Sequence, residues 1–167
     1  MTAHPTESSM KLLDFLVTDA TVDDLEAVEK EDVIRELVGR LVTAGAIGPR
    51  SAKGIIQAIM DREALGSTGI GRGIAVPHAK HASVDRLVGC MGRSKTGVNF
   101  AAIDGEPVFL VFLLVSPLDQ PGPHLKALEH ISIVLRDENF SRFLRRARDK
   151  TELVSLLAEA DEKLYKG

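Results

Sequence analysis

The sequence predicts a single α/β domain in which one β-sheet is covered by helices on both faces. Segments with helical periodicity alternate with short segments rich in β-forming residues, which is the pattern of this class. The second observation is "PVFLVFLLVS", where eight consecutive residues from Val108 to Val115 are apolar. Crossing a bilayer needs about 20 residues, so this run is too short for a membrane span. A strand that is apolar throughout is typical of the centre of a sheet buried on both faces.

Two helices are expected in the first part of the chain. One lies in "EKEDVIRELVGRLVTAG", where apolar residues recur at helical spacing and Gly45 supplies a stop signal. The other lies in "SAKGIIQAIMDREAL", with Ser51 as the N-cap and with an apolar face formed by Ile55, Ile56 and Ile59. The segment "MKLLDFLV" that precedes them fits either an edge strand or one helical turn.

Two more strands are expected between the second helix and the central strand. The loop "GSTGIGRG" leads into "GIAVPH", which is interpreted as a strand that ends at Pro77. The segment "RLVGCMGRS" follows, with residues that alternate as in a strand. After the central strand, "SPLDQPGP" holds three prolines in eight residues and is expected to be a loop.

The C-terminal part of the chain is expected to be helical. Three helical segments follow the proline-rich loop: "HLKALEHISIVLRD", "NFSRFLRRARD" and "TELVSLLAEADEKL", the last capped by Thr151. No internal repeat or linker divides the chain. We therefore expect residues 10–164 to form one domain, preceded by a flexible polar tail at residues 1–9.

The composition excludes several classes of protein. Hydrophobic residues make up 44% and charged residues 27% of the chain, which is a globular balance. The net charge of −3 and the pI near 6.0 argue against a nucleic-acid partner. Neither a membrane-inserting segment nor a secretory signal is recognisable. The single cysteine, Cys90, cannot form an internal disulfide and predicts a cytoplasmic location.

The histidines do not form a zinc pattern. His78 and His81 are three residues apart at the end of a strand, where a shared face is not assured. His124 and His130 are six residues apart on a predicted helix, so they point in different directions. No cysteine or carboxylate stands beside them at zinc-ligand spacing. We expect neither a metal nor another cofactor.

Three residues remain as candidates for chemistry. His78 follows Pro77 at a strand end, where α/β sheets build sites, although a solvent-exposed loop histidine is the simpler interpretation. His124 opens a predicted helix whose free N–H groups favour an anion, or it is a first-turn surface residue. Arg62 is expected near the end of the second helix. Its guanidinium could bind phosphate oxygens or only offset the helix dipole.

Three stretches together resemble one known family: "DREALGSTGIGRGIAVPHAK", "AIDGEPVFLVFLLVSP" and "HLKALEHIS". They are similar to the enzyme IIA domain of the fructose/mannitol type, which belongs to the bacterial phosphoenolpyruvate-dependent sugar phosphotransferase system (PTS). The similarity runs from about Lys11 to Leu164, and "EDVIRELVGRLVTAGAI" is most similar to the nitrogen-regulatory branch. The resemblance implies a mixed β-sheet flanked by helices.

The resemblance also implies an activity. His78 corresponds to the histidine that the family phosphorylates on Nε2, His124 to its second active-site histidine, and Arg62 to its site arginine. The chain would then be a phosphotransferase that works through a phosphohistidine intermediate. The implied donor is the carrier protein HPr. The implied acceptor is an enzyme IIB domain or, in the regulatory branch, a target such as a kinase or transporter.

Phosphoryl transfer would assign a role to each of the three residues. The attacking nitrogen of His78 must be unprotonated, Arg62 would neutralise the phosphoryl oxygens, and an N–H of His124 would donate to one of them. Ser67 and Thr68 are candidates for further hydroxyl donors from the loop. Two alternatives stay open: a protein-binding module of the same fold without efficient transfer, and a sugar-transport enzyme IIA for fructose or mannitol.

Overall fold

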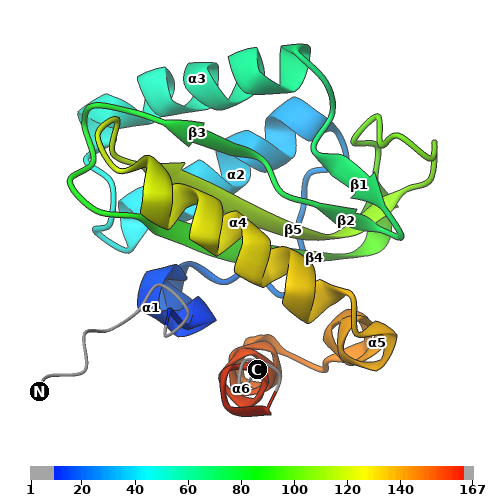
Figure 1. Cartoon of the computed structure of the whole chain (residues 1–167). Coiled ribbons are helices and arrows are strands. Elements are labelled where there is room, and N and C mark those ends of the chain that lie inside the picture. Colours follow the sequence, from blue (N-terminus) through cyan, green and yellow to red (C-terminus); the bar gives the residue numbers. More distant parts are fainter. Residues whose placement is uncertain (1–9, 164–167) are drawn as a thin grey trace, which may run out of the picture.

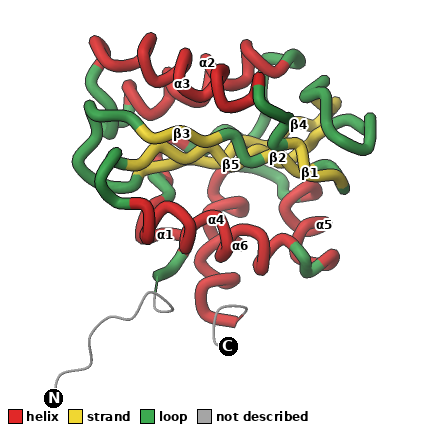
Figure 2. The backbone as a smooth tube through the Cα atoms, turned by 45° about the horizontal axis from the view of Figure 1, so that its top comes forward, coloured by secondary structure: helices red, strands yellow, loops and turns green. Residues whose placement is uncertain are grey.

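The computed structural model describes residues 10–163, and the tail expected at residues 1–9 lies outside them. The described chain forms three layers, with a five-stranded sheet between two groups of helices (Figure 1). Helices α2 (Lys30–Thr43) and α3 (Ala52–Ala64) cover one face. Figure 2 shows the other face covered by α1 (Leu12–Phe15), α4 (Pro121–Leu135), α5 (Glu138–Arg146) and α6 (Lys150–Lys163). The predicted α/β class is confirmed.

The sheet is mixed and centred on β5 (Val108–Ser116). One edge of β5 pairs antiparallel with β4 (Val88–Val98). The other edge pairs in parallel with β2 (Ile74–Ala75) and, further along, with β3 (His78–Lys80). The short strand β1 (Gly69–Gly71) pairs antiparallel with β2. The apolar segment is therefore the central strand, as predicted, and the mixed sheet is confirmed.

The two faces of β5 enter two separate halves of the core. From Leu110 to Val115 the odd-numbered residues pack with α2 and α3, and the even-numbered residues pack with α4, α5 and α6. All six side chains are at most 1% exposed. Burial on both faces explains why this strand carries no polar residue until Ser116, its last one.

The strand predicted in "GIAVPH" is broken into two pieces. It does not end at Pro77 as predicted, because β3 resumes at His78 along the same edge of β5. Between the pieces, the N–H of Val76 donates to the carbonyl of Thr68 over 3.1 Å. The carbonyl of Pro77 accepts from Leu114, but its ring nitrogen has no hydrogen to donate. The break thus follows from the missing N–H, and it places His78 at the start of a strand.

The glycine-rich segment, predicted to be a loop, contains β1 and a tight hairpin turn. The two residues between β1 and β2 are Arg72, with φ of 58°, and Gly73, with φ of 79°. Positive φ at both central positions is the requirement of a type I′ turn, which matches the twist of a hairpin. Gly73 therefore serves the backbone geometry of this turn.

Two helix starts differ from the prediction. Helix α4 begins at Pro121, so the end of the predicted "SPLDQPGP" loop is the first turn of this helix. Proline suits that turn because its missing N–H would have no helical partner there. Helix α6 begins at Lys150, and Asp149 caps it by accepting the Glu152 N–H over 2.9 Å. Thr151, predicted as the cap, lies inside the helix.

The segment before α2 protects the edge of the sheet. Its first part is the helical turn α1, and it then runs beside β4 with parallel bridges from Leu16 to Gly89 and from Val22 to Gly92. Of the two interpretations of "MKLLDFLV", the helical turn is confirmed, and only a single bridge residue, Leu16, pairs as an edge strand would. Covering β4 removes an open edge that could pair with another chain. None of the helices within residues 10–163 has the length and hydrophobicity needed to cross a membrane.

Gly89 is a position in β4 where β5 leaves no room for a side chain. A Cβ added there would overlap the carbonyl oxygen of Leu113 and lie 2.7 Å from Cδ2 of Leu114. We expect Gly89→Ala to lower the free energy of unfolding by about 1–3 kcal/mol through overpacking. Urea-induced unfolding measures this change. The control is Gly39→Ala in α2, where nothing lies within 4 Å and alanine favours the helix by about 1 kcal/mol. Equal effects of the two substitutions would contradict the expected close contact.

Candidate functional site

His78 lies at the boundary between the sheet and α4. Its register partner on β5 is Leu114, which belongs to the half of the core that packs against α4. The ring of His78 is half-buried on that face. Its Nδ1 is 2.7 Å from the carbonyl oxygen of Val76. A carbonyl only accepts hydrogen bonds, so Nδ1 carries the hydrogen and, in the neutral ring, Nε2 keeps a free lone pair.

His124 faces His78 from the first turn of α4. The two ring centroids are 5.3 Å apart, and His124 is 5% exposed. Its Nδ1 is 2.6 Å from the hydroxyl of Ser116, the last residue of β5. The backbone N–H of His124 donates to the carbonyl of Gln120 over 3.4 Å. Because α4 begins earlier than predicted, any donor to an anion at this position is the ring, and not the backbone.

Both imidazoles are held in the neutral form near pH 7. Burial is the main cause that lowers the pKa of His78, and the charge of Arg62 adds to it. The carbonyl of Val76 and the carboxylate of Glu63 oppose this change. Burial, followed by the neighbouring His78, lowers the pKa of His124 to about 4. An uncharged imidazole is the form that can act as a nucleophile.

Arg62 belongs to the opposite helical layer. It lies in the last turn of α3, where one of its guanidinium nitrogens, Nη1, donates to the carbonyl of Gly66 over 3.0 Å. It is near enough for its charge to act on the pKa of His78. The structure thus brings His78 and His124 together as neighbouring rings. Arg62 acts on His78 through its charge, while one of its N–H groups is bound to Gly66.

The two predicted loop donors have partners inside the protein. The hydroxyl of Ser67 donates to the carbonyl of Phe100 over 3.1 Å. Thr68 is buried, and its hydroxyl donates to the carboxylate of Glu63. Donation from either hydroxyl to a phosphoryl group therefore stays a prediction, and it would require these bonds to change.

Within residues 10–163, no group of three histidine, cysteine or acidic side chains is arranged to hold a metal ion. His81 turns its Nδ1 to the hydroxyl of Ser83, 2.7 Å away. His130 is buried within α4.

A comparison with known protein families identifies the family of this chain. Residues 14–160 match the family model described as "Phosphoenolpyruvate-dependent sugar phosphotransferase system, EIIA 2". The chain belongs to this EIIA family. The resemblance seen in the sequence is thereby confirmed.

Curated relatives of this EIIA domain include both regulatory and transport proteins. The nitrogen regulatory protein of Bradyrhizobium diazoefficiens is 32% identical over 149 residues, which are 89% of this chain and 95% of that protein. The fructose-specific EIIABC component of Bacillus subtilis is 37% identical over 153 residues. Those residues are 92% of this chain but only 24% of that protein, so the EIIA domain spans about a quarter of that relative.

Solved structures share the fold. The nitrogen regulatory protein IIA-Ntr from Neisseria meningitidis aligns with a TM-score of 0.78 at 30% identity, covering 86% of this chain and 97% of that one. The mannitol IIA from Escherichia coli, in a complex with phosphorylated IIB, aligns with a TM-score of 0.71 at 25% identity. That alignment covers 86% of this chain and 97% of the other.

Sequence reasoning missed Glu63, which connects the elements of the site. This buried carboxylate pairs with Lys30 over 2.8 Å and accepts from both the N–H and the hydroxyl of Thr68. Thr68 in turn accepts from Val76, whose carbonyl holds His78. A continuous set of hydrogen bonds therefore runs from α3 to the imidazole. In the sequence, the signal that could have found Glu63 is its position as an acidic residue directly after Arg62.

Glu63→Gln tests whether this network positions His78. We expect the pKa of His78 to fall further, because the carboxylate raises it. We also expect the free energy of unfolding to drop by roughly 3 kcal/mol, as when one partner of a buried ion pair is lost. An NMR titration of the His78 ring and urea unfolding measure the two effects. Glu36→Gln is the control, since Glu36 also binds backbone N–H groups, those of Glu26 and Ala27. If both variants leave the His78 titration unchanged, Glu63 has only a structural role.

The low pKa of His124 predicts a pH-dependent stability. In the unfolded chain this histidine binds a proton near its ordinary pKa of about 6.5, but in the folded domain only near pH 4. The free energy of unfolding should therefore decrease as the pH falls from about 6.5 to about 4, by about 1.4 kcal/mol for each unit of pKa difference. Urea unfolding at pH 7 and pH 4.5 measures the loss, and His124→Gln should reduce it. An equal loss in this variant would contradict the assignment.

Proposed function

We propose that this EIIA domain is a cytoplasmic phosphocarrier, in which His78 accepts a phosphoryl group from the phosphohistidine of an HPr-type protein and passes it to a second protein. The observation that carries the proposal is the hydrogen bond from Nδ1 of His78 to the carbonyl of Val76. It leaves the Nε2 lone pair free for attack. Family membership supports the same conclusion, because EIIA domains of the PTS are phosphotransfer proteins.

The transfer is a displacement at phosphorus. Nε2 of His78 forms a bond to the phosphorus as the nitrogen–phosphorus bond of the donor breaks, and the donor imidazole leaves with that electron pair. The entering and leaving nitrogens must lie in line, while negative charge spreads over three oxygens. Protein groups contribute mainly by aligning the reactants and stabilising that charge.

Arg62 and His124 are the groups proposed to stabilise the phosphoryl oxygens. The guanidinium of Arg62 has further N–H groups beside the one bound to Gly66. If the Ser116 hydroxyl donates to Nδ1 of His124, the hydrogen of that neutral ring is on Nε2, where it can donate to an oxygen. Burial keeps His124 neutral, so it donates without adding a cation next to the attacking imidazole.

Exposed leucines provide a surface for the partner proteins. Leu65, Leu118 and Leu125 are 84%, 61% and 65% exposed. Each follows a site residue closely in the sequence: Arg62, Ser116 and His124, respectively. Apolar side chains around a reactive group suit the core of a protein–protein contact.

For the downstream role we propose the nitrogen-regulatory branch. The higher TM-score with IIA-Ntr, 0.78 against 0.71 for mannitol IIA, supports it. Phosphorylation adds a charge of about −1.5 to −2 at the surface, which can select between partners. The acceptor would be a regulatory target, with an enzyme IIB domain as the alternative.

Phosphorylation in vitro tests the proposal. The domain is incubated with phosphoenolpyruvate, enzyme I and HPr, and acid-labile phosphoryl groups are counted by intact-protein mass spectrometry. We expect a single group on the native domain and none on His78→Ala. His124→Leu should slow the transfer roughly 100-fold, as for removal of one donor to a developing charge.

His81→Ala is the control for this experiment. His81 directly follows β3, but its Nδ1 is bound to Ser83, so its loss should leave the phosphorylation unchanged. Label that persists in a folded His78→Ala variant would refute the role of His78. Absence of label from the native domain, together with binding of a partner in a pull-down, would instead show the module without transfer.

A further inference from the structure

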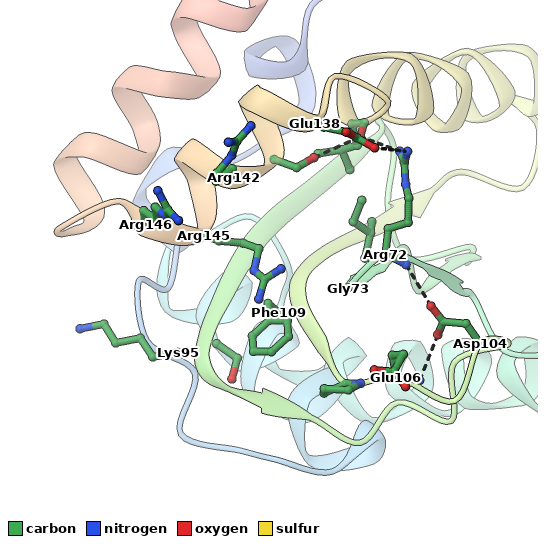
Figure 3. Close-up of a pocket in the computed structure, with 15 residues that line it drawn as sticks. Arg72, Gly73, Lys95, Asp104, Glu106, Phe109, Glu138, Arg142, Arg145 and Arg146 are labelled. Atoms are coloured by element: carbon green, nitrogen blue, oxygen red, sulfur yellow. Dashed lines mark hydrogen bonds and ion pairs between the residues drawn. The ribbon is translucent and has the colours of Figure 1, made fainter.

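A second concave site lies at the other end of the sheet. It is a cavity of about 1010 Å³ between the β1–β2 turn, the strands β4 and β5, and α5 (Figure 3). Phe109 of β5 lines it. Phe109 is five residues from Leu114, the register partner of His78, which is roughly 16 Å along the strand. The cavity is therefore separate from the histidine pair.

Cations outnumber carboxylates around this cavity, although the whole chain has a net charge of −3. The five cationic lining residues are Arg72, Lys95, Arg142, Arg145 and Arg146. The three acidic ones are Asp104, Glu106 and Glu138. The local balance is thus opposite to that of the chain.

The carboxylates are concentrated on the side of Arg72. The guanidinium of Arg72 lies 3.8 Å from Glu138, and its backbone N–H donates to Asp104 over 3.1 Å. On the other side, Lys95, Arg145 and Arg146 form no ion pair with any carboxylate of the described residues. We call these three residues the basic wall.

A buried charge lies behind the basic wall. Arg93 is 1% exposed and donates to the carbonyls of Leu144 and Arg145, at the end of α5. It forms no ion pair within residues 10–163, and its Nη2 has no hydrogen-bond partner there. A buried cation without a counterion is unfavourable. An anion held at the adjacent wall would offset that cost.

Phe109 contributes an aromatic ring to the cavity wall, and Arg145 covers one face of that ring. The guanidinium of Arg145 lies 3.9 Å from the centre of its ring, and Figure 3 shows Arg145 reaching over Phe109 while Arg72 lies across the cavity. A guanidinium fixed in this way presents its N–H groups to phosphate oxygens in pairs. Glu106, near the turn, is an acceptor for hydroxyl or amino groups.

We propose that this cavity binds a nucleoside di- or triphosphate. The phosphates would lie against Lys95, Arg145 and Arg146, and the nucleoside would lie toward Phe109 and Glu106. The volume suits an organic molecule of that size, since small-molecule sites span about 300–1,000 Å³. This site does not depend on the phosphorylation of His78.

Isothermal titration calorimetry with ADP, in magnesium-free buffer at physiological salt, tests the proposal. We expect saturable binding of one ADP, and affinity at least tenfold lower in the double variant Arg145→Gln/Arg146→Gln. The matched control is Arg136→Gln/Arg148→Gln, which removes the same charge from exposed residues on either side of α5 that do not line the cavity. His78→Ala should bind ADP as the native domain does.

Two further ligands separate the contribution of the nucleoside to the affinity from that of the phosphates. Adenosine should not bind, and tripolyphosphate should bind more weakly than ADP. Amide NMR shifts on ADP addition should map to Lys95 and Phe109. No saturable binding, equal losses in the two double variants, or shifts centred on His78 would overturn the site. Tripolyphosphate binding as tight as that of ADP would overturn the assignment to a nucleoside.

Discussion

The break in the sheet at Val76 and Pro77 is the constraint on which the site depends. A proline cannot donate to the ladder, so the edge beside β5 is interrupted just before His78. The carbonyl of Val76 then accepts from the imidazole two residues later. This short bond fixes the tautomer of His78, and with it the nitrogen that stays free. An uninterrupted strand would not present the side chain in this way.

The rest of the fold brings distant residues to that break. Alternation along β5 sends Leu114 and Ser116 to the face of α4, and Ser116 orients His124 there. Arg62 comes from α3 on the opposite face. The ion pair of Glu63 with Lys30 ties the end of that helix to α2, and the bonds that Glu63 accepts from Thr68 tie it to the loop. The site therefore forms at the edge of the sheet, between the last turn of α3 and the first turn of α4. Its geometry depends on the two halves of the apolar core.

The sequence predicted those features that depend on local pattern. The apolar run of β5 and the periodicity of the helices were sufficient for the fold class, and the motifs around His78, His124 and Arg62 were specific in combination. Strand β1 was missed because a strand of three residues among glycines resembles a loop. Glu63 was missed because its partner Lys30 is 33 residues away and is brought to it only by tertiary packing.

The two ends of the sheet have opposite electrostatic requirements, and α4 connects them. Its first turn holds His124, and its last residue, Leu135, lines the cavity roughly 16 Å away. An imidazole nucleophile must be uncharged, so the histidine end relies on burial and keeps its cation outside the ring pair. The proposed binding of phosphates needs charged side chains, and the arginines of α5 have no carboxylate partners in the described chain. The net charge of −3 of the whole chain therefore does not describe the local charge around the cavity, where cations outnumber carboxylates.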